Sequence, residues 1–400
     1  MKIPEIPGDT LTGRAAWQEW MTCRSQIALL ALAAFVLTTT GCAAFSPPVA
    51  VATKSEAVRL ALAELDGYAQ GIADANRFAG VVLIANGDEI LFEKAYGKID
   101  ENKANLAPPT TRYNLASAGK MFTSVAILQQ IAAGRITLDT RVGDILSGYP
   151  NQDVAKQVTI RHLLTHTAGT GDIDIFGQEN AENRRAARSV AEMMALHSDR
   201  APSFAPGSKQ EYGNFGFVIL GRILEVLSGE SYENYLARHI FGPAGMRHTG
   251  FVDCNANEPD IAIGYVLIDG ISQRNCATLP AKGFPAGGTI STARDMFLFV
   301  RALQLGALIP PEIFDDATRT HVAYMGLGFF ATGYGEGVPA RDFRWGHGGS
   351  ADGINADVRV YPKTGEIVIV LANKDAPAAH QIAAFLHDRH NFNTAAIQLR

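Results

Sequence analysis

A serine and a lysine stand at a spacing that suits nucleophilic catalysis. Ser117 and Lys120 are the two ends of a Ser-Ala-Gly-Lys segment that opens an apolar run with helical periodicity. Residues three apart lie on one face of a helix, so the lysine amine is expected beside the serine hydroxyl. A serine hydroxyl is a weak nucleophile until a base accepts its proton, and an amine with a lowered pKa can do so. Considered alone, however, the spacing is better explained by a helix start with a solvated lysine.

A Tyr-x-Asn motif can complete such a site, and the sequence contains it three times. The copy at Tyr149 lies in a predicted turn, and the copy at Tyr232 lies in a helical pattern where tyrosine is expected to pack. The third copy follows a loop and precedes a predicted helix. There, Tyr212 can share the role of base and Asn214 can donate to a substrate carbonyl. A tyrosine before a helix is more often a packing residue, so this motif is also inconclusive alone.

The third candidate is the glycine-rich segment Trp345-Gly-His-Gly-Gly-Ser350, which ends a predicted strand. Small residues at Gly348 and Gly349 let a substrate lie along the strand edge, and the backbone N–H of Ser350 can join an oxyanion hole. The alternative is a strand that ends in a glycine turn and carries an ordinary exposed histidine, His347.

The elements around these motifs are read from periodicity. Alternating apolar residues predict five strands, and Asn86-Gly87 between the first two predicts a hairpin turn. The strands are expected at Gly80–Ala85, Glu89–Tyr96, Phe343–His347, Gly353–Tyr361 and Glu366–Leu371. A spacing of three to four predicts helices. These are expected at 55–76, 117–133, 160–165, 183–197, 214–228, 231–240, 292–305 and 378–388.

This order predicts an α/β (α+β) fold in which both ends of the chain build one five-stranded antiparallel sheet flanked by helices. The α/β lobe comprises about 54–112 and 306–390, and the inserted helical lobe about 113–305, within one domain over 54–390. A site is expected in the cleft between the lobes. Asp172 and Asp174 are expected to line its entrance.

The N-terminal 1–53 is interpreted as a signal peptide and linker. The apolar run from Ile27 to Leu37 has the length of a signal-peptide core and is too short for a membrane-spanning helix. It ends at Gly41-Cys42, which is similar to a lipobox although Thr39 stands where leucine is usual. Lipidation of Cys42 would anchor the protein to a membrane, and a plain cleaved signal is the alternative. The protein is therefore expected to be exported, to the periplasm or cell envelope.

Composition excludes some functions. The net charge is −5 without long basic runs, which argues against nucleic-acid binding. Cys254 and Cys276 can pair in an oxidising compartment, but two free or partly buried thiols are the favoured expectation. Neither has zinc-ligand spacing, and His162 and His166 lack the glutamate of a zinc-protease helix, so no metal is expected.

The order and spacing of the three motifs together resemble the serine β-lactamase and penicillin-binding-protein superfamily. The similarity covers most of 55–390 and is to the branch of class C β-lactamases, D-alanyl-D-alanine carboxypeptidases and family VIII esterases. Supporting segments are Arg161–Gly169, Pro285–Asp295 and Val368–Lys374.

The resemblance implies a role for each motif residue. It implies that Ser117 forms an acyl-enzyme that water hydrolyses, activated by Lys120 and Tyr212, with the choice of base left open. Asn214 would orient Lys120 and the substrate, and the N–H groups of Ser117 and Ser350 would form the oxyanion hole. The resemblance implies no metal or organic cofactor, and a structural role for the segment that carries His162 and His166.

Two departures concern the substrate. The usual Lys-Thr-Gly of β-lactamases is His347-Gly348-Gly349 here, and the segment Asp375–Gln381 lacks the Asn and Arg found near the carboxylate in class C enzymes. Losing such charge-assisted contacts, ~1.5–3 kcal/mol each, makes efficient β-lactam hydrolysis unexpected. The favoured function is an esterase or amidase for small acyl substrates. A peptidase for D-amino-acid peptides is the alternative, and a non-catalytic cell-wall sensor is the least favoured.

Overall fold

The computed structural model describes residues 56–172, 181–333 and 343–389. The predicted signal segment and Cys42 lie outside these ranges, as does Asp174. Within the described ranges, no helix is both long and apolar enough to cross a membrane.

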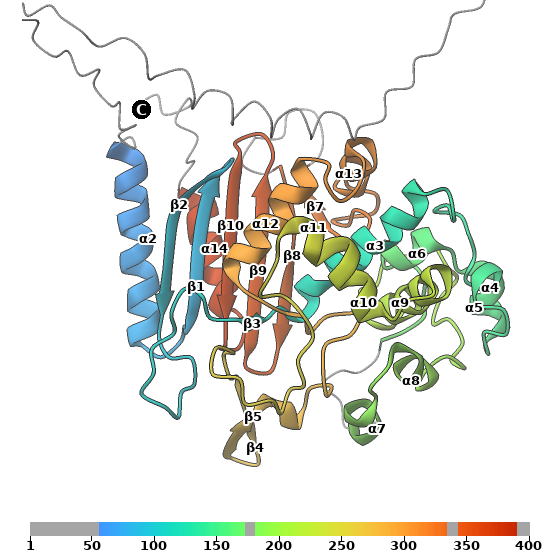
Figure 1. Cartoon of the computed structure of the whole chain (residues 1–400), viewed down its shortest axis with the longest axis horizontal. Helices are drawn as coiled ribbons and strands as arrows, with labels where there is room; N and C mark the ends of the chain where they lie inside the picture. The colour runs from blue at the N-terminus through green and yellow to red at the C-terminus, as the bar shows by residue number, and fades with distance from the viewer. Residues whose placement is uncertain (1–55, 173–180, 334–342, 390–400) are drawn as a thin grey trace, which may run out of the picture. The chain divides into compact units, whose positions relative to one another are not determined.

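The central element is an antiparallel sheet of six strands in the order β2-β1-β10-β9-β8-β7 (Figure 1). Its strands are β1 Gly80–Asn86, β2 Glu89–Tyr96, β7 Phe330–Thr332, β8 Arg344–Ala351, β9 Ile354–Tyr361 and β10 Glu366–Ala372. The five predicted strands are present, and β1 pairs with β10, so the two ends of the chain share one sheet as expected. The sheet has one strand more than predicted, because β7 is too short to show alternation.

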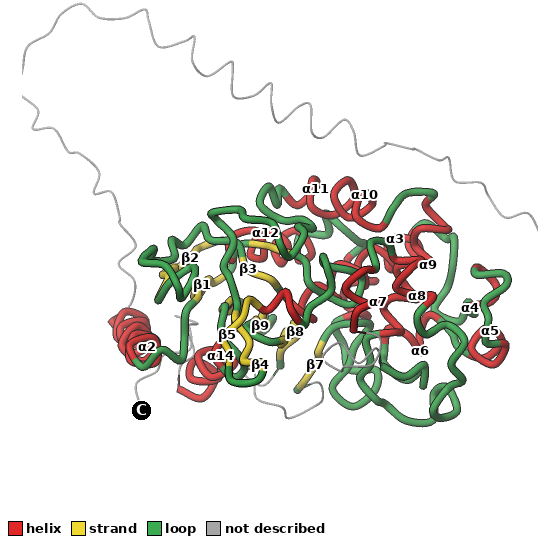
Figure 2. The backbone as a smooth tube through the Cα atoms, turned by 90° about the horizontal axis from the view of Figure 1, so that it is seen from below, coloured by secondary structure: helices red, strands yellow, loops and turns green. Residues whose placement is uncertain are grey.

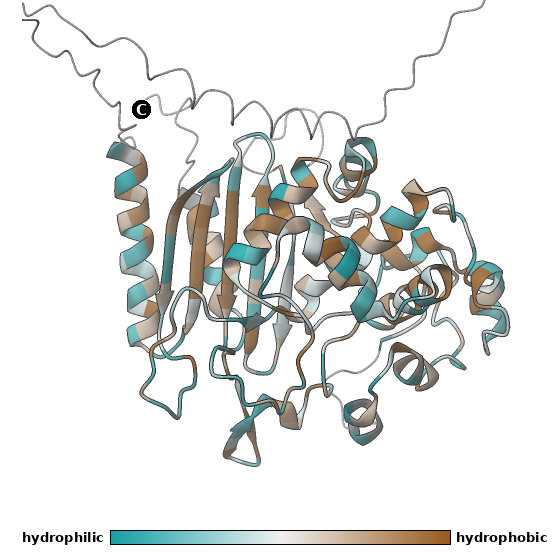
Figure 3. Cartoon of the chain, viewed as in Figure 1, coloured by the Kyte–Doolittle hydropathy of each residue, from teal (hydrophilic) through white to brown (hydrophobic). Residues whose placement is uncertain are grey.

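Both faces of the sheet are covered by helices. In β1, Val81 and Leu83 pack in the core that includes α12 (Ala293–Gln304). Val82 and Ile84 pack instead in the cluster with α2 (Glu56–Asp74) and α14 (Ala378–Arg389). Figure 2 shows α12 on one side of the strands and α2 and α14 on the other. In the hydropathy colouring of Figure 3, β1 and most of β10 are hydrophobic, whereas β9 also carries polar residues.

The segment between β2 and β7 contains most of the described helices. Its elements are η1 Ala116–Gly119, α3 Lys120–Ala132, α4 Val142–Ile145, α5 Gln152–Gln157, α6 Ile160–Leu164, α7 Ala181–Ala186, α8 Val190–Ala195, α9 Phe215–Ser228, α10 Tyr232–Leu236, η2 Ala237–Phe241, α11 Gly242–Ala244, η3 Asn275–Ala277, α12 and α13 Pro311–Ala317. The predicted helix 183–197 is two helices, because Ser189 caps a new start at α8. Thr292 caps the start of α12, its hydroxyl accepting from the N–H of Asp295.

Two small strand pairs lie in this segment. β3 (Tyr113–Asn114) pairs with β6 (Ile290–Ser291), and β4 (Tyr265–Ile268) forms a hairpin with β5 (Ile271–Arg274). The β3–β6 pair matters for the site because β3 leads directly into η1.

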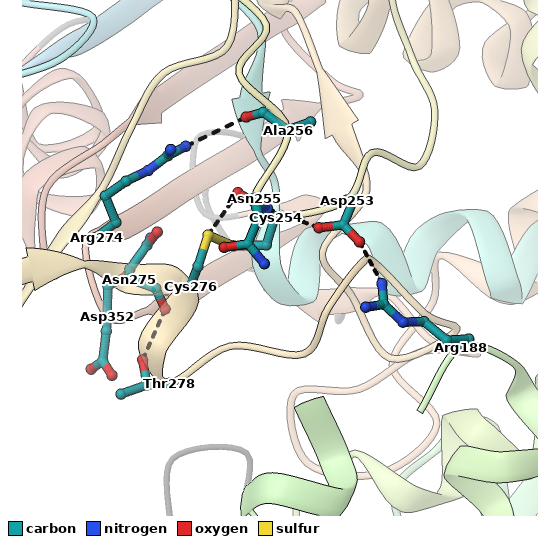
Figure 4. Close-up of a disulfide and its surroundings, with 10 residues drawn as sticks. All are labelled: Arg188, Asp253, Cys254, Asn255, Ala256, Arg274, Asn275, Cys276, Thr278 and Asp352. Atoms are coloured by element: carbon teal, nitrogen blue, oxygen red, sulfur yellow. Dashed lines mark hydrogen bonds and ion pairs between the residues drawn. A yellow bond between two sulfur atoms is a disulfide. The ribbon is translucent and has the colours of Figure 1, made fainter. Parts of the chain in front are cut away.

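Cys254 and Cys276 form a disulfide, so the expectation of two free thiols is wrong (Figure 4). The β4–β5 hairpin returns the chain on itself and brings the two Cα atoms to 5.5 Å, a distance that a disulfide spans. The two residues carry no local signal of this, since the contact depends on the hairpin between them.

Candidate active site

Ser117 lies in a tight turn rather than in the α-helix that the sequence predicts from this residue. It belongs to the 3-10 turn η1, and α3 begins at Lys120. The turn begins with Ala116 at φ +43°, a left-handed conformation that is unfavourable for alanine and typical of functional sites. Asn114 stabilises it, since its Oδ1 accepts the Ala116 N–H at 2.8 Å. The hydroxyl of Ser117 is thus presented from a constrained backbone.

Lys120 is completely buried and directed at Ser117. Its Nζ donates to Ser117 Oγ at 3.2 Å, to Asn214 Oδ1 at 2.6 Å and to the Ala286 carbonyl at 2.6 Å. Burial lowers the pKa of this amine to about 7, and the carboxylate of Asp172 opposes the shift. A substantial fraction of the amine is therefore neutral at neutral pH and able to accept a proton.

Asn214 connects this lysine to Asp172. Asn214 is the residue before α9, and both its backbone N–H and its side-chain amide donate to Asp172 Oδ1, at 2.8 and 2.9 Å. These bonds orient the amide so that its oxygen faces Lys120. The sequence predicts Asp172 only at the entrance and misses this contact, because nothing in the local pattern pairs it with a residue 42 positions later.

Tyr212 approaches the same amine through its ring. Lys120 Nζ lies 5.0 Å from the ring centroid. The Tyr212 hydroxyl is buried and makes no hydrogen bond of normal geometry within the described residues. Burial raises the pKa of the Tyr212 hydroxyl, while Ser117 acts to lower it. The phenol is therefore neutral at neutral pH.

His166 holds Tyr212 in place. The two rings stack at 4.3 Å, and His166 Nδ1 accepts the Gly213 N–H at 3.2 Å. Burial, Lys120 and His347 lower the pKa of His166 well below its usual value. The ring is neutral and orients the Tyr-x-Asn loop, a contact that the sequence does not indicate.

Strand β8 brings the third motif against the serine turn. A Cβ placed on Gly349 would lie 2.1 Å from the Leu115 carbonyl and 3.1 Å from the Ala118 nitrogen, so only glycine allows this approach. Gly348 is different, because the nearest atom to a Cβ there is 3.7 Å away. The absence of a side chain at Gly348 is therefore not a steric requirement of the fold.

His347 is buried, contrary to the alternative of an ordinary exposed histidine. Its ring stacks on Phe330 at 4.1 Å, and Nδ1 lies 2.5 Å from the Gly348 carbonyl oxygen. Burial, reinforced by the nearby Lys120 charge, lowers the pKa of His347 to about 3. A neutral ring stands where a lysine cation would attract a substrate carboxylate.

A pocket of about 950 Å³, open to solvent, contains both Ser117 and Ser350 in its lining. Its walls are mainly apolar: Val252, Ile261, Ile263, Leu279, Phe284, Ile290 and Ile354. The disulfide also lines it, together with the charged residues Asp253, Arg274 and Lys282. Such a pocket favours an uncharged, hydrophobic part of a ligand near the serine. Among the described residues, no group of three or more His, Cys, Asp or Glu is placed to hold a metal ion.

In this site, a Ser/Lys pair lies between a helical segment and an antiparallel sheet and faces a glycine-rich strand. This arrangement defines the class of serine β-lactamases and penicillin-binding proteins. Residues 65–391 match the family described as Beta-lactamase, so the chain belongs to the β-lactamase family of serine hydrolases.

Relatives agree with this assignment. Penicillin-binding protein 4 of Amycolatopsis lactamdurans is 28% identical over 313 residues, which cover 74% of this chain and 80% of that protein. A penicillin-binding protein from Bacillus halodurans superposes with a TM-score of 0.71 at 26% identity, over 83% of this chain and 98% of that one. A D-stereospecific amidohydrolase from Streptomyces sp. gives 0.68 at 26%, over 81% and 98%. In two Bacillus subtilis proteins named as penicillin-binding proteins, the match covers 62% and 53% of their length.

Proposed function

We propose that this protein is a serine hydrolase that cleaves small esters or amides through an acyl-enzyme on Ser117. The observation that carries the proposal is the contact between the Ser117 hydroxyl and a buried Lys120 amine with a pKa of about 7. A base with a pKa near the working pH is unprotonated in a large fraction of molecules and still binds a proton strongly.

In the first step, Ser117 Oγ attacks the substrate carbonyl and its proton passes to Lys120 Nζ. The tetrahedral oxyanion is stabilised by the backbone N–H groups of Ser117 and Ser350. Collapse releases the alcohol or amine, which takes a proton from the Lys120 ammonium, and leaves the acyl group on Ser117. Water then attacks the acyl-enzyme, and the same base accepts its proton.

The directions of the pKa shifts support Lys120 rather than Tyr212 as the base. Burial favours the neutral form of both groups, which makes the amine an acceptor and keeps the phenol protonated. Tyr212 then acts as a hydrogen-bond donor near Ser117, and Asn214 positions the lysine.

Two features support an ester or amide rather than a β-lactam. His347 is neutral and Gly348 has no hydroxyl, so this strand offers neither the charge nor the side-chain donor that would hold a β-lactam carboxylate. The pocket beside Ser117 is largely apolar and suits an acyl chain.

A D-peptide or D-amino-acid amide is the second candidate substrate. The similarity to the D-stereospecific amidohydrolase, at 26% identity, supports it. Export would place the enzyme where such peptides occur. The Cys254–Cys276 disulfide supports an oxidising compartment, and lipidation of Cys42 would add an anchor to the membrane.

The substrate class is tested by comparing 4-nitrophenyl butyrate with a chromogenic cephalosporin on one purified preparation. We expect kcat/KM for the ester to exceed that for the cephalosporin by at least about 100-fold, the loss expected from two missing charge-assisted contacts. Turnover of a D-alanyl amide is measured on the same preparation to test the second candidate substrate class. Cephalosporin turnover equal to ester turnover would contradict the proposal.

Changing the charge near Lys120 is expected to move the pH profile. In the native protein, kcat/KM should rise with pH around a midpoint near 7, as the amine loses its proton. Asp172 favours the protonated amine, so Asp172→Asn should move this midpoint to lower pH, by up to about one unit. The asparagine oxygen can still accept from Asn214. Asp315→Asn, a change at an exposed residue of α13, serves as the control and should leave the midpoint in place. An unmoved midpoint in Asp172→Asn would argue against Lys120 as the titrating base.

A further inference from the structure

One cation in the pocket beside Ser117 has no acidic partner among the residues that the structure describes. Three charged residues line this pocket: Asp253, Arg274 and Lys282. Asp253 forms an ion pair with Arg188, and Lys282 forms one with Glu233. Arg274 forms no salt bridge within the described part of the chain. No carboxylate of the described residues therefore neutralises its charge.

The hydrogen-bonding capacity of Arg274 is also largely unused. Its Nη2 donates to the Ala256 carbonyl over a long 3.5 Å, and its Nε is buried without an acceptor among the described residues. Figure 4 shows the side chain on one side of the disulfide, away from the Asp253–Arg188 pair. A buried donor without an acceptor is unfavourable, and an anionic ligand that accepts from it would relieve this cost.

The position of Arg274 is constrained by the elements around it. It is the last residue of β5, and Tyr265 is its pairing partner in β4. The following residue, Asn275, donates through Nδ2 to the Asp352 carbonyl at 2.8 Å, which ties the hairpin to the turn after β8. Cys276 is held by the disulfide. The backbone position of Arg274 is therefore fixed by the β4–β5 pairing and by the contacts of the two residues that follow it.

We propose that Arg274 binds a carboxylate on the acyl group of the substrate, so that the preferred substrates are esters or amides of acyl groups that end in a carboxylate. This inference rests on the proposed function and extends it. The apolar walls contact the hydrocarbon part of the acyl group, while the guanidinium forms a bidentate pair with its terminal carboxylate. The carboxylate of the acyl group would thus bind at the β4–β5 hairpin. It would not bind at β8, because the ring of His347 there is neutral.

The test compares half-esters with their neutral counterparts. The substrates are mono-4-nitrophenyl glutarate and adipate, each beside the methyl 4-nitrophenyl diester of the same acid. In the native enzyme, we expect kcat/KM for the better half-ester to exceed that for its diester by about tenfold or more, the value of one charge-assisted contact. Arg274→Gln should remove most of this ratio, mainly through KM, and high salt should reduce it.

Two further variants make the result specific. Lys282→Gln removes a cation of the same pocket that already has a partner, and it should change the ratio by less than about threefold. Arg274→Lys retains the charge without the bidentate geometry and should give an intermediate ratio. Free adipate should inhibit native diester turnover competitively, and 1,6-hexanediol, which has no carboxylate and no ester, should not. This comparison needs no variant.

The outcomes separate the two proposals. If the native enzyme shows no preference for half-esters and no inhibition by adipate, the role of Arg274 is wrong although Ser117-dependent turnover stands. If Lys282→Gln and Arg274→Gln reduce the preference for half-esters equally, the preference comes from the overall positive potential of the pocket and not from a contact with Arg274. This result would also overturn the proposed role of Arg274. Turnover that survives Ser117→Ala would overturn the proposed function itself.

Discussion

A Ser117→Ala variant is expected to fold normally and to lose at least about 10⁴-fold in ester kcat, the scale found when a catalytic nucleophile is removed. Ser117 is half-buried, and within the described residues its hydroxyl accepts a hydrogen bond from Lys120 Nζ. Removing the oxygen leaves Lys120 bonded to Asn214 and Ala286, so the thermal unfolding temperature should change little. Turnover and unfolding temperature are measured on the same preparation.

A second serine provides the control for the Ser117→Ala variant. Ser272 in β5 is exposed, so Ser272→Ala should keep native turnover. An acyl-enzyme trapped with a slow ester and detected by mass should appear in the native protein and be absent from Ser117→Ala. Retention of ligand binding and biological effect in Ser117→Ala would instead support a non-catalytic sensor.

A Lys120→Met variant is expected to lose about 10²–10⁴-fold in kcat/KM, the range that general-base catalysis contributes. Methionine fills a similar buried volume without an amine. The acceptors Asn214 Oδ1 and the Ala286 carbonyl then lose their donor, which should lower stability by about 1–3 kcal/mol for each group left unpaired. Activity and urea unfolding are measured together, so that the kinetic loss can be separated from partial unfolding.

Tyr212→Phe is the comparison for this variant. It keeps the ring that stacks on His166 and removes a hydroxyl that has no hydrogen bond of normal geometry to any described residue. Its loss in kcat/KM should be smaller than that of Lys120→Met, and its pH midpoint should stay near that of the native enzyme. The reverse order of the two losses would assign the base to Tyr212.

The sequence predicts much of the scaffold because its signals are local. Period-2 runs indicate β1, β2, β9 and β10, and the Asn86-Gly87 turn joins the first two as expected, with Gly87 at φ +57°. A three-residue spacing is enough to bring Ser117 and Lys120 together.

The unpredicted features depend on contacts between distant segments. Asp172 meets Asn214, His166 stacks on Tyr212, and Cys254 meets Cys276 only after the intervening chain has folded. The burial of His347 similarly depends on Phe330 from the short strand β7. Periodicity and motif spacing describe a residue's neighbours along the chain and contain no direct measure of such contacts.

The pairing of β1 with β10 sets a condition on folding kinetics. Gly80 pairs with Ala372, so a strand formed near the start of the domain waits for one near its end. Closing so long a loop slows folding and leaves the β1 edge unpaired in any shorter nascent chain. Until β10 arrives, that apolar edge can associate with other chains, and an early stop codon before β10 would leave it permanently exposed. The sheet can therefore be completed only after β10 has been synthesised.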